Sequence, residues 1–213
     1  SKLTITAASA AWSAVQWRGP GAGAAAVAAG VAAAELQPGE VAASPAGGWW
    51  LAGEAGGIEL GEWLAPAEAI RAAWPRLLPQ ARPAGSAAQE RDRILSRVPR
   101  YGADITAAEL PQESGQMARL DFTKGCYVGQ EIVERIRARG AVPRHWTSFV
   151  LSGAAEPGTS VASDGKESGK LTSIIRREGD GHPDWFGLGY IRDPHGAPGT
   201  PVTIGGVTGR VEP

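Results

Sequence analysis

The stretch KGCYVGQE, from Lys124 to Glu131, places a thiol between two glycines immediately before an amphipathic segment. Backbone N–H groups at the start of a helix, together with a nearby lysine, favour the thiolate form of a cysteine. Glycines allow a sharp turn and the close approach of a ligand. Cys126 and Lys124 are therefore candidate catalytic residues. On its residues alone the stretch also fits a small buried cysteine beside a helix cap, which is the more frequent case.

The residues on either side of this stretch predict a loop before it and a helix after it. A helix is predicted to begin near Gly129, because Ile132, Val133 and Ile136 repeat with the period of one helix face and would point inward. Residues 101–122 show no sustained periodicity and predict a loop with short turns.

Further upstream, a second helix follows a linker. Residues 79–85 are rich in proline, glycine and alanine, and predict the linker. Ser86 and Gln89 form the pattern of a capping box, which predicts a helix that runs as far as Val98 before Pro99.

Downstream of Pro143 the chain consists of short apolar runs separated by glycine, proline and aspartate. This pattern is typical of a small antiparallel barrel. The five predicted strands are His145–Leu151, Thr159–Ala162, Gly169–Arg177, Trp185–Ile191 and Pro201–Val211.

The first 80 residues are poor in charge and rich in Ala, Gly and Trp, and they predict a mixture of strands and helices. A helix is expected to open at Pro66, with Ile70, Trp74, Leu77 and Leu78 on its inner face. The other predicted elements are strands at Leu3–Thr6, Ala14–Trp17, Trp49–Leu51 and Ile58–Leu60, and a helix over Pro20–Leu36.

Composition restricts the class of protein. The 213 residues carry 21 Lys and Arg against 22 Asp and Glu, a net charge of −1 that argues against strong nonspecific DNA binding. Cys126 is the single cysteine, which excludes an intramolecular disulfide and is typical of a reducing compartment; no metal site is predicted. The most apolar run, Ala22–Leu36, is too short for a membrane span, and the N-terminus lacks a secretory signal pattern. We predict a cytoplasmic protein without a membrane partner.

The stretch Lys124–Glu131, with Ile132-Val133-Glu134-Arg135 after it, resembles the signature of the YgfZ-type folate-binding proteins, which are relatives of the glycine-cleavage T protein (GcvT, aminomethyltransferase). The resemblance is strong from about residue 86 to 145, fair from 146 to 213 and thin before 80. Shorter matches occur in the family's order at Arg93-Ile94, Val98-Pro99, Tyr101-Gly102, Asp104-Ile105, Leu110-Pro111-Gln112-Glu113, Gly140, Arg144, Gly169, Leu171-Thr172-Ser173 and Leu188-Gly189-Tyr190.

This resemblance implies an α+β fold. A GcvT-like folate-binding domain would occupy residues 1–145, with its N-terminal part missing, and a small C-terminal antiparallel β-barrel would occupy 146–213. Family members usually carry a glycine where Arg97 stands, so the local turn is expected to differ there.

The resemblance also implies a site and a function. The cofactor would be tetrahydrofolate or a one-carbon derivative. Tyr101 would pack on the flat pterin, Glu113 would accept hydrogen bonds from its amino-pyrimidine edge, and Arg144 would orient the tail carboxylates through a bidentate fork. Cys126 would be the essential reactive group in supporting iron-sulfur cluster assembly or repair and tRNA modification. Implied partners are folate and iron-sulfur proteins or their assembly machinery.

Three alternatives stay open at this stage. The chain could be a true aminomethyltransferase that transfers a one-carbon unit to tetrahydrofolate. The glycines Gly21 and Gly23 and the small residues after them satisfy a relaxed dinucleotide-binding pattern, which the abundance of Ala and Gly makes weak evidence. Segment 119–144 carries six basic residues against three acidic ones and could contact tRNA, although a solvated helix face is preferred because no aromatic ladder accompanies the charges.

Overall fold

The computed structural model describes residues 9–140, 142–178 and 184–212. Its contacts divide the chain into two compact units, Ser1–Gln89 and Glu90–Pro213, which are described separately. The predicted strand Leu3–Thr6 lies outside the described residues. In the part of the chain that is described, no helix has the length and apolar character needed to cross a membrane.

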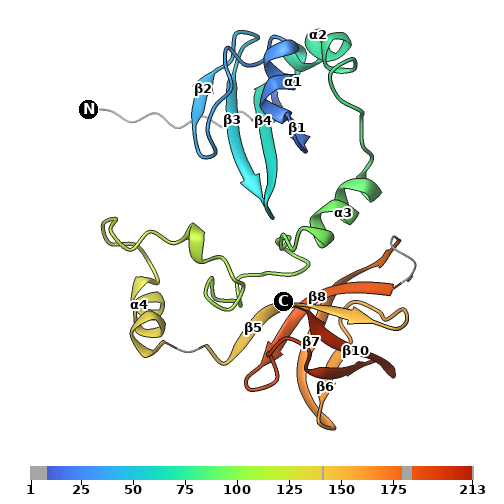
Figure 1. Cartoon of the computed structure of the whole chain (residues 1–213). Helices are drawn as coiled ribbons and strands as arrows, with labels where there is room; N and C mark the ends of the chain where they lie inside the picture. The colour runs from blue at the N-terminus through green and yellow to red at the C-terminus, as the bar shows by residue number, and fades with distance from the viewer. Residues whose placement is uncertain (1–8, 141, 179–183, 213) are drawn as a thin grey trace. The chain divides into compact units, whose positions relative to one another are not determined.

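The first unit is a four-stranded antiparallel sheet with two helices (Figure 1). Gly56 and Gly57 both adopt positive φ, at 62° and 75°, as a two-residue hairpin turn requires, and they join the third and fourth strands. In spatial order the strands are β1 (Trp12–Arg18), β4 (Ile58–Pro66), β3 (Trp49–Ala55) and β2 (Val41–Ala43), and the helices are α1 (Ala22–Ala28) and α2 (Ala67–Leu77).

Tryptophans dominate the core of the first unit, where the helices pack on β1 and β4. Trp17, Trp50 and Trp63 are buried, and the rings of Trp17 and Trp50 meet edge to face with their centroids 5.4 Å apart. Trp50 lies so close to Gly61 that a Cβ there would come within 2.0 Å of the indole. The packing of Trp50 therefore requires glycine at position 61.

Two helices of this unit differ from the predictions. The predicted helix over Pro20–Leu36 is confirmed only as the seven residues of α1, because Gly30 takes a left-handed φ of 72° just after its end. On α2 the buried face is Ile70, Ala73 and Leu77, whereas Trp74 is 44% exposed and Leu78 is also exposed. Trp74 lies at the edge of this buried stripe, about 40° beyond Ile70 and about 100° from Ala73 around the helix, so its large ring extends past the buried face.

The second unit contains a closed antiparallel barrel of six strands (Figure 1). The barrel is confirmed, but the predicted strand Pro201–Val211 is two strands, because Gly205 and Gly206 form a turn with φ of 59° and 84°. Around the barrel the strands are β10 (Val207–Glu212), β5 (Arg144–Leu151), β8 (Asp184–Arg192), β7 (Lys166–Arg177), β6 (Ser160–Ser163) and β9 (Pro201–Ile204).

The part of helix α3 (Ser86–Leu95) that belongs to the second unit, from Glu90 on, and the segment after it lie against the outside of this barrel. Ile94 packs with Val150, Phe186 and Leu188 in a small buried cluster. The helix ends at Leu95 rather than near Val98, because Arg97 adopts a left-handed φ of 55° and donates its N–H to Ile94. Arg97 thus takes the conformation that a glycine would adopt most easily at this position.

The segment between α3 and the barrel is irregular apart from a short 3-10 turn, Met117–Arg119, and α4 (Gln130–Arg139). Gly129 is the residue before α4, as predicted. Val133 is buried, but Ile132 is 52% exposed, so the predicted inward face is only partly confirmed. The first barrel strand starts at Arg144. The compact unit that contains the barrel, however, starts at Glu90. A domain boundary at residue 145 therefore stays a prediction.

Candidate functional site

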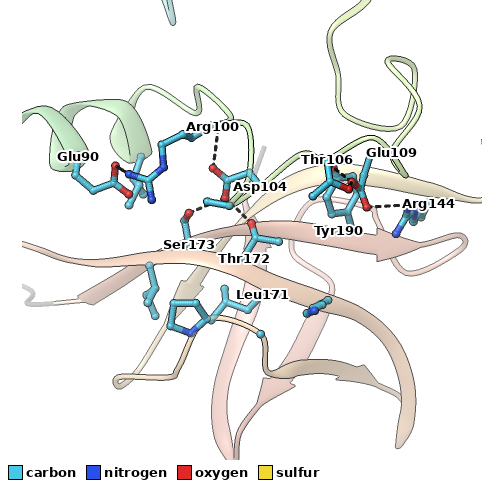
Figure 2. A pocket seen from close by; sticks show the side chains of 16 residues that line it. Glu90, Arg100, Asp104, Thr106, Glu109, Arg144, Leu171, Thr172, Ser173 and Tyr190 are labelled. Atoms are coloured by element: carbon cyan, nitrogen blue, oxygen red, sulfur yellow. Dashed lines mark hydrogen bonds and ion pairs between the residues drawn. The ribbon is translucent and has the colours of Figure 1, made fainter.

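The second unit contains a pocket of about 500 Å³ against the outer face of the barrel. Side chains from α3, from the turns over residues 100–109 and from strands β5, β7 and β8 line it, as Figure 2 shows. Its charged lining residues are Glu90, Arg100, Asp104, Glu109, Arg144 and Lys170. The pocket therefore presents both signs of charge.

Asp104 forms the buried polar centre of one wall. Its carboxylate accepts hydrogen bonds from Arg93 Nη1 (2.5 Å), the backbone N–H of Arg100 (2.9 Å), Thr172 Oγ1 (2.7 Å) and Ser173 Oγ (2.6 Å). The register of β7 against β8 shifts between Leu171 and Ser173, and such a bulge changes where side chains point. The bulge thus lets two successive hydroxyls bind one carboxylate (Figure 2).

Arg144 lies between two carboxylates. Its Nη2 is 3.1 Å from Glu113 Oε2 and 3.4 Å from Glu109 Oε1, and the pKa of Arg144 is raised, chiefly by the hydrogen bond to Glu113. The Thr106 hydroxyl donates to Glu109 at 2.6 Å and is the main reason why the pKa of Glu109 is lowered. Glu113 is 5% exposed. One guanidinium is thus shared by two carboxyl groups.

Tyr190 connects this charged group to the barrel. Its ring lies 4.8 Å from the Arg144 guanidinium and 5.3 Å from the Trp146 ring. Burial raises the pKa of the Tyr190 hydroxyl. Within the described residues, Tyr190 Oη, Trp146 Nε1 and Gln112 Oε1 are buried without a hydrogen-bond partner. Buried polar atoms are usually satisfied, so an unsatisfied group beside a pocket suggests a ligand or water.

Tyr101 lies on the turn next to the pocket but does not line it. Its side chain is 72% exposed, while the neighbouring Arg100 and Ala103 are lining residues. The turn is closed by the N–H of Gly102, which donates to the carbonyl of Ile105 at 2.8 Å. The structure therefore presents Tyr101 to solvent at the edge of the wall that Asp104 holds.

Cys126 is exposed, which contradicts the alternative that it is a buried hydrophobic residue. Lys124 packs its ammonium 4.6 Å from the centre of the Tyr127 ring. Helix α4 begins at Gln130 and Gly129 has a φ of 90°, so Cys126 precedes the first turn of the helix in the chain.

Of the five predicted site residues, the structure brings Glu113 and Arg144 together. Within the described ranges, no hydrogen bond or ion pair joins Tyr101, Lys124 or Cys126 to that pair. Five polar pocket residues that the sequence analysis did not assign to the site are Asp104, Glu109, Thr172, Ser173 and Tyr190. All but Glu109 belong to the short matches of the family resemblance, which could have marked them.

The contacts of Gly21 and Gly23 argue against the dinucleotide-binding alternative. Glu59 Oε2 accepts the N–H of Gly21 at 2.8 Å, and its Oε1 accepts that of Gly23 at 2.7 Å. These are the N–H groups that would have to cradle a phosphate. The Glu59 carboxylate therefore occupies the place that a phosphate would take.

Part of the positive charge of segment 119–144 is neutralised by an acidic residue of the same helix. Arg137 is 3.6 Å from Glu134 and lies 4.2 Å from the centre of the Phe122 ring. This arrangement is consistent with the preferred solvated helix face. Among the described residues, no group of three or more His, Cys, Asp or Glu side chains is arranged to hold a metal ion.

One solved structure shares the fold of this chain. The crystal structure of glycine cleavage system aminomethyltransferase T from Bartonella henselae superposes with a TM-score of 0.78 and 19% identity, over 94% of this chain and 58% of that one. The chain therefore has the fold of a GcvT-type aminomethyltransferase. No protein-family model matches the chain.

Two curated proteins are similar in sequence. "Putative transferase At1g60990, chloroplastic" of Arabidopsis thaliana is 35% identical over 144 residues, which is 67% of this chain and 32% of that protein. An aminomethyltransferase of Halothermothrix orenii is 28% identical over 127 residues, which is 57% of this chain and 34% of that protein. The aligned region is about a third of the length of each.

Proposed function

We propose that this chain is the folate-binding part of a YgfZ-type protein that supports iron-sulfur cluster assembly or repair, including that of enzymes that modify tRNA. Its cofactor would be tetrahydrofolate or a one-carbon derivative, and its partners iron-sulfur proteins or their assembly machinery. The proposal places it in the cytoplasm, consistent with a single cysteine, although the name of the Arabidopsis relative assigns that protein to the chloroplast.

The observation that carries the folate proposal is the pocket beside the Glu109–Arg144–Glu113 group in a GcvT-type fold. A volume of about 500 Å³ lies in the range of small-molecule sites. A pterin has a donor-bearing amino-pyrimidine edge, which carboxylates accept well, and a flat face that suits aromatic side chains. The unpartnered Tyr190 hydroxyl adds a polar group that a bound heterocycle could satisfy. The residues present therefore fit tetrahydrofolate.

Cys126 carries the second half of the proposal. An exposed thiol is available to a reaction partner, which a buried one is not. It would act as a nucleophile, as a redox group or as a transient cluster ligand. A single cysteine cannot hold an iron-sulfur cluster without other ligands, so a ligand role would require the partner to supply them.

Calorimetric titration with tetrahydrofolate tests the folate proposal. We expect saturable heat from this chain and at least a tenfold weaker affinity after Glu113→Ala, which removes one carboxylate and leaves Arg144 paired with Glu109 alone. Because the change also breaks an ion pair, thermal unfolding must first show that the variant is folded at the temperature of the titration. Absence of heat from the unaltered chain would remove the folate proposal.

A true aminomethyltransferase is the second candidate, favoured by the relative from Halothermothrix orenii. The two functions differ in one assay. An aminomethyltransferase forms methylene-tetrahydrofolate from an aminomethylated lipoyl carrier protein, and the first proposal predicts none. Formation of methylene-tetrahydrofolate by this chain would make the aminomethyltransferase the preferred function.

A further inference from the structure

The contact between Arg144 and Glu113 restricts how a folate can lie. The amino-pyrimidine edge and the tail carboxylates of folate are at opposite ends of the molecule. Arg144 and Glu113 are 3.1 Å apart, so they cannot each bind a different end of one ligand. The two roles that the family resemblance implies for them therefore exclude one another.

The charges around Arg144 determine which end of the folate fits beside it. Arg144 uses Nη2 to contact both Glu109 and Glu113, and Glu113 is almost fully buried. Two carboxylates around one guanidinium repel an additional anion and attract hydrogen-bond donors. The Arg144 end of the pocket thus fits the amino-pyrimidine edge and disfavours the glutamate tail.

The tail then needs another cation. Three positively charged residues line the pocket: Arg100, Arg144 and Lys170. Arg100 is already paired with Glu90 at 2.8 Å. Lys170 is exposed, and it makes no ion pair with any residue that the structure describes. It lies directly opposite Tyr190 in the pairing of β7 with β8, so it is anchored beside the pocket by the barrel.

We propose that Lys170 receives the tail carboxylates of the bound folate, while Arg144 acts as a positioning residue that holds Glu109 and Glu113. This inference rests on the proposed folate function and goes beyond it by fixing the direction of the ligand. It makes Lys170 the determinant of preference for folates with longer glutamate tails.

The test compares three ligands by calorimetry: tetrahydrofolate, its triglutamate form, and 6-methyltetrahydropterin, which has no tail. We expect the unaltered chain to bind the triglutamate most tightly. Lys170→Ala should weaken binding of tetrahydrofolate up to about fivefold, the range of one exposed ion pair, and remove the preference for the triglutamate. Binding of the tail-free pterin should not change.

Lys166→Ala is the matched control, because Lys166 is an exposed lysine on the same strand that does not line the pocket. It should leave all three affinities unchanged. The triglutamate preference should also shrink with added salt in the unaltered chain, because the tail contact is exposed.

Two results would overturn the inference without touching the folate function. One is an unchanged triglutamate preference in Lys170→Ala. The other is loss of that preference in a folded Arg144→Gln variant that still binds the tail-free pterin with unchanged affinity. A chain that binds none of the three ligands would instead remove the proposed function itself.

Discussion

The Thr172 hydroxyl donates a hydrogen bond to the Asp104 carboxylate at 2.7 Å and so ties a turn beside α3 to strand β7 of the barrel. The two residues are 68 positions apart in the chain. Because the Asp104 side chain is fully buried, loss of any of these hydrogen bonds would leave a polar atom without a partner and without water to replace it. This carboxylate therefore couples the pocket wall to the barrel.

Asp104→Asn should lower the stability of the second unit strongly. The change removes the charge opposite Arg93 and replaces an acceptor by an amide donor that faces two hydroxyls. Breaking a buried ion pair costs about 3–5 kcal/mol, and we expect about 3 kcal/mol because Arg93 keeps Glu90 as a partner. Urea unfolding followed by fluorescence measures the change in the free energy of unfolding.

The control for Asp104 is Asp184→Asn, which opens the more exposed pair with Arg177. A surface pair contributes about 1 kcal/mol or less, so the control should unfold at nearly the urea concentration of the unaltered chain. Equal effects of the two changes would show that the buried Asp104 contributes no more to stability than the more exposed Asp184.

Tyr190→Phe should leave stability unchanged or raise it by about 1 kcal/mol. The hydroxyl is buried without a partner among the described residues, so its removal ends a desolvation cost and breaks no bond. Ser173→Ala is the matched deletion of a hydroxyl that has partners, Asp104 and Arg93, and should destabilise by about 1–2 kcal/mol. Thermal unfolding ranks the two variants, and destabilisation by Tyr190→Phe would show that this hydroxyl has a partner in the folded protein.

The stability of the first unit should depend on the ionisation of Glu59. Hydrogen bonds from the backbone N–H groups of Gly23 and Gly21 lower the pKa of Glu59 below its usual value of 4.5. A depressed folded-state pKa stabilises the protein above the unfolded-state pKa, and the stabilisation is lost as pH falls through the folded-state pKa.

Glu59→Gln should therefore cost about 1 kcal/mol at neutral pH and have a smaller effect in acid. Chemical unfolding of the first unit at pH 7 and in steps below pH 4.5 measures this dependence. Glu62→Gln, on the same strand at a position whose carboxylate makes no hydrogen bond or ion pair with a described residue, should have little effect at any of these pH values. A pH-independent effect of Glu59→Gln would contradict the ionic explanation.

Much of the fold could be predicted because its signals are local. The barrel strands are short apolar runs bounded by glycine and proline, and the split of the last strand follows from Gly205 and Gly206, which were visible in the sequence. The shortening of α1 likewise follows from Gly30. Each of these positions combines positive φ with a residue that tolerates it.

The candidate site depended on contacts that no local pattern contains. Glu113 and Arg144 are 31 positions apart, and Arg93 and Ser173 are 80 apart. The N–H of Trp146 donates to the carbonyl of Glu113 at 2.7 Å, and this backbone bond brings the loop beside β5. Family resemblance supplied Glu113 and Arg144, but their mutual contact, which excludes two separate ligand roles, required the tertiary structure.

Cys126→Ser should abolish the biological function that we propose and leave the fold intact. The thiol is exposed, and a surface substitution of this size changes stability by at most about 0.5 kcal/mol, so thermal unfolding should be unaltered. Alkylation by iodoacetamide should be complete in the folded, unaltered chain and absent in the variant. In cells that depend on the full-length protein, the variant should fail to restore iron-sulfur enzyme activity although it accumulates normally. Restoration to the level of the unaltered protein would remove the thiol from the mechanism, while tetrahydrofolate binding, which does not involve Cys126 in our proposal, should be the same in both.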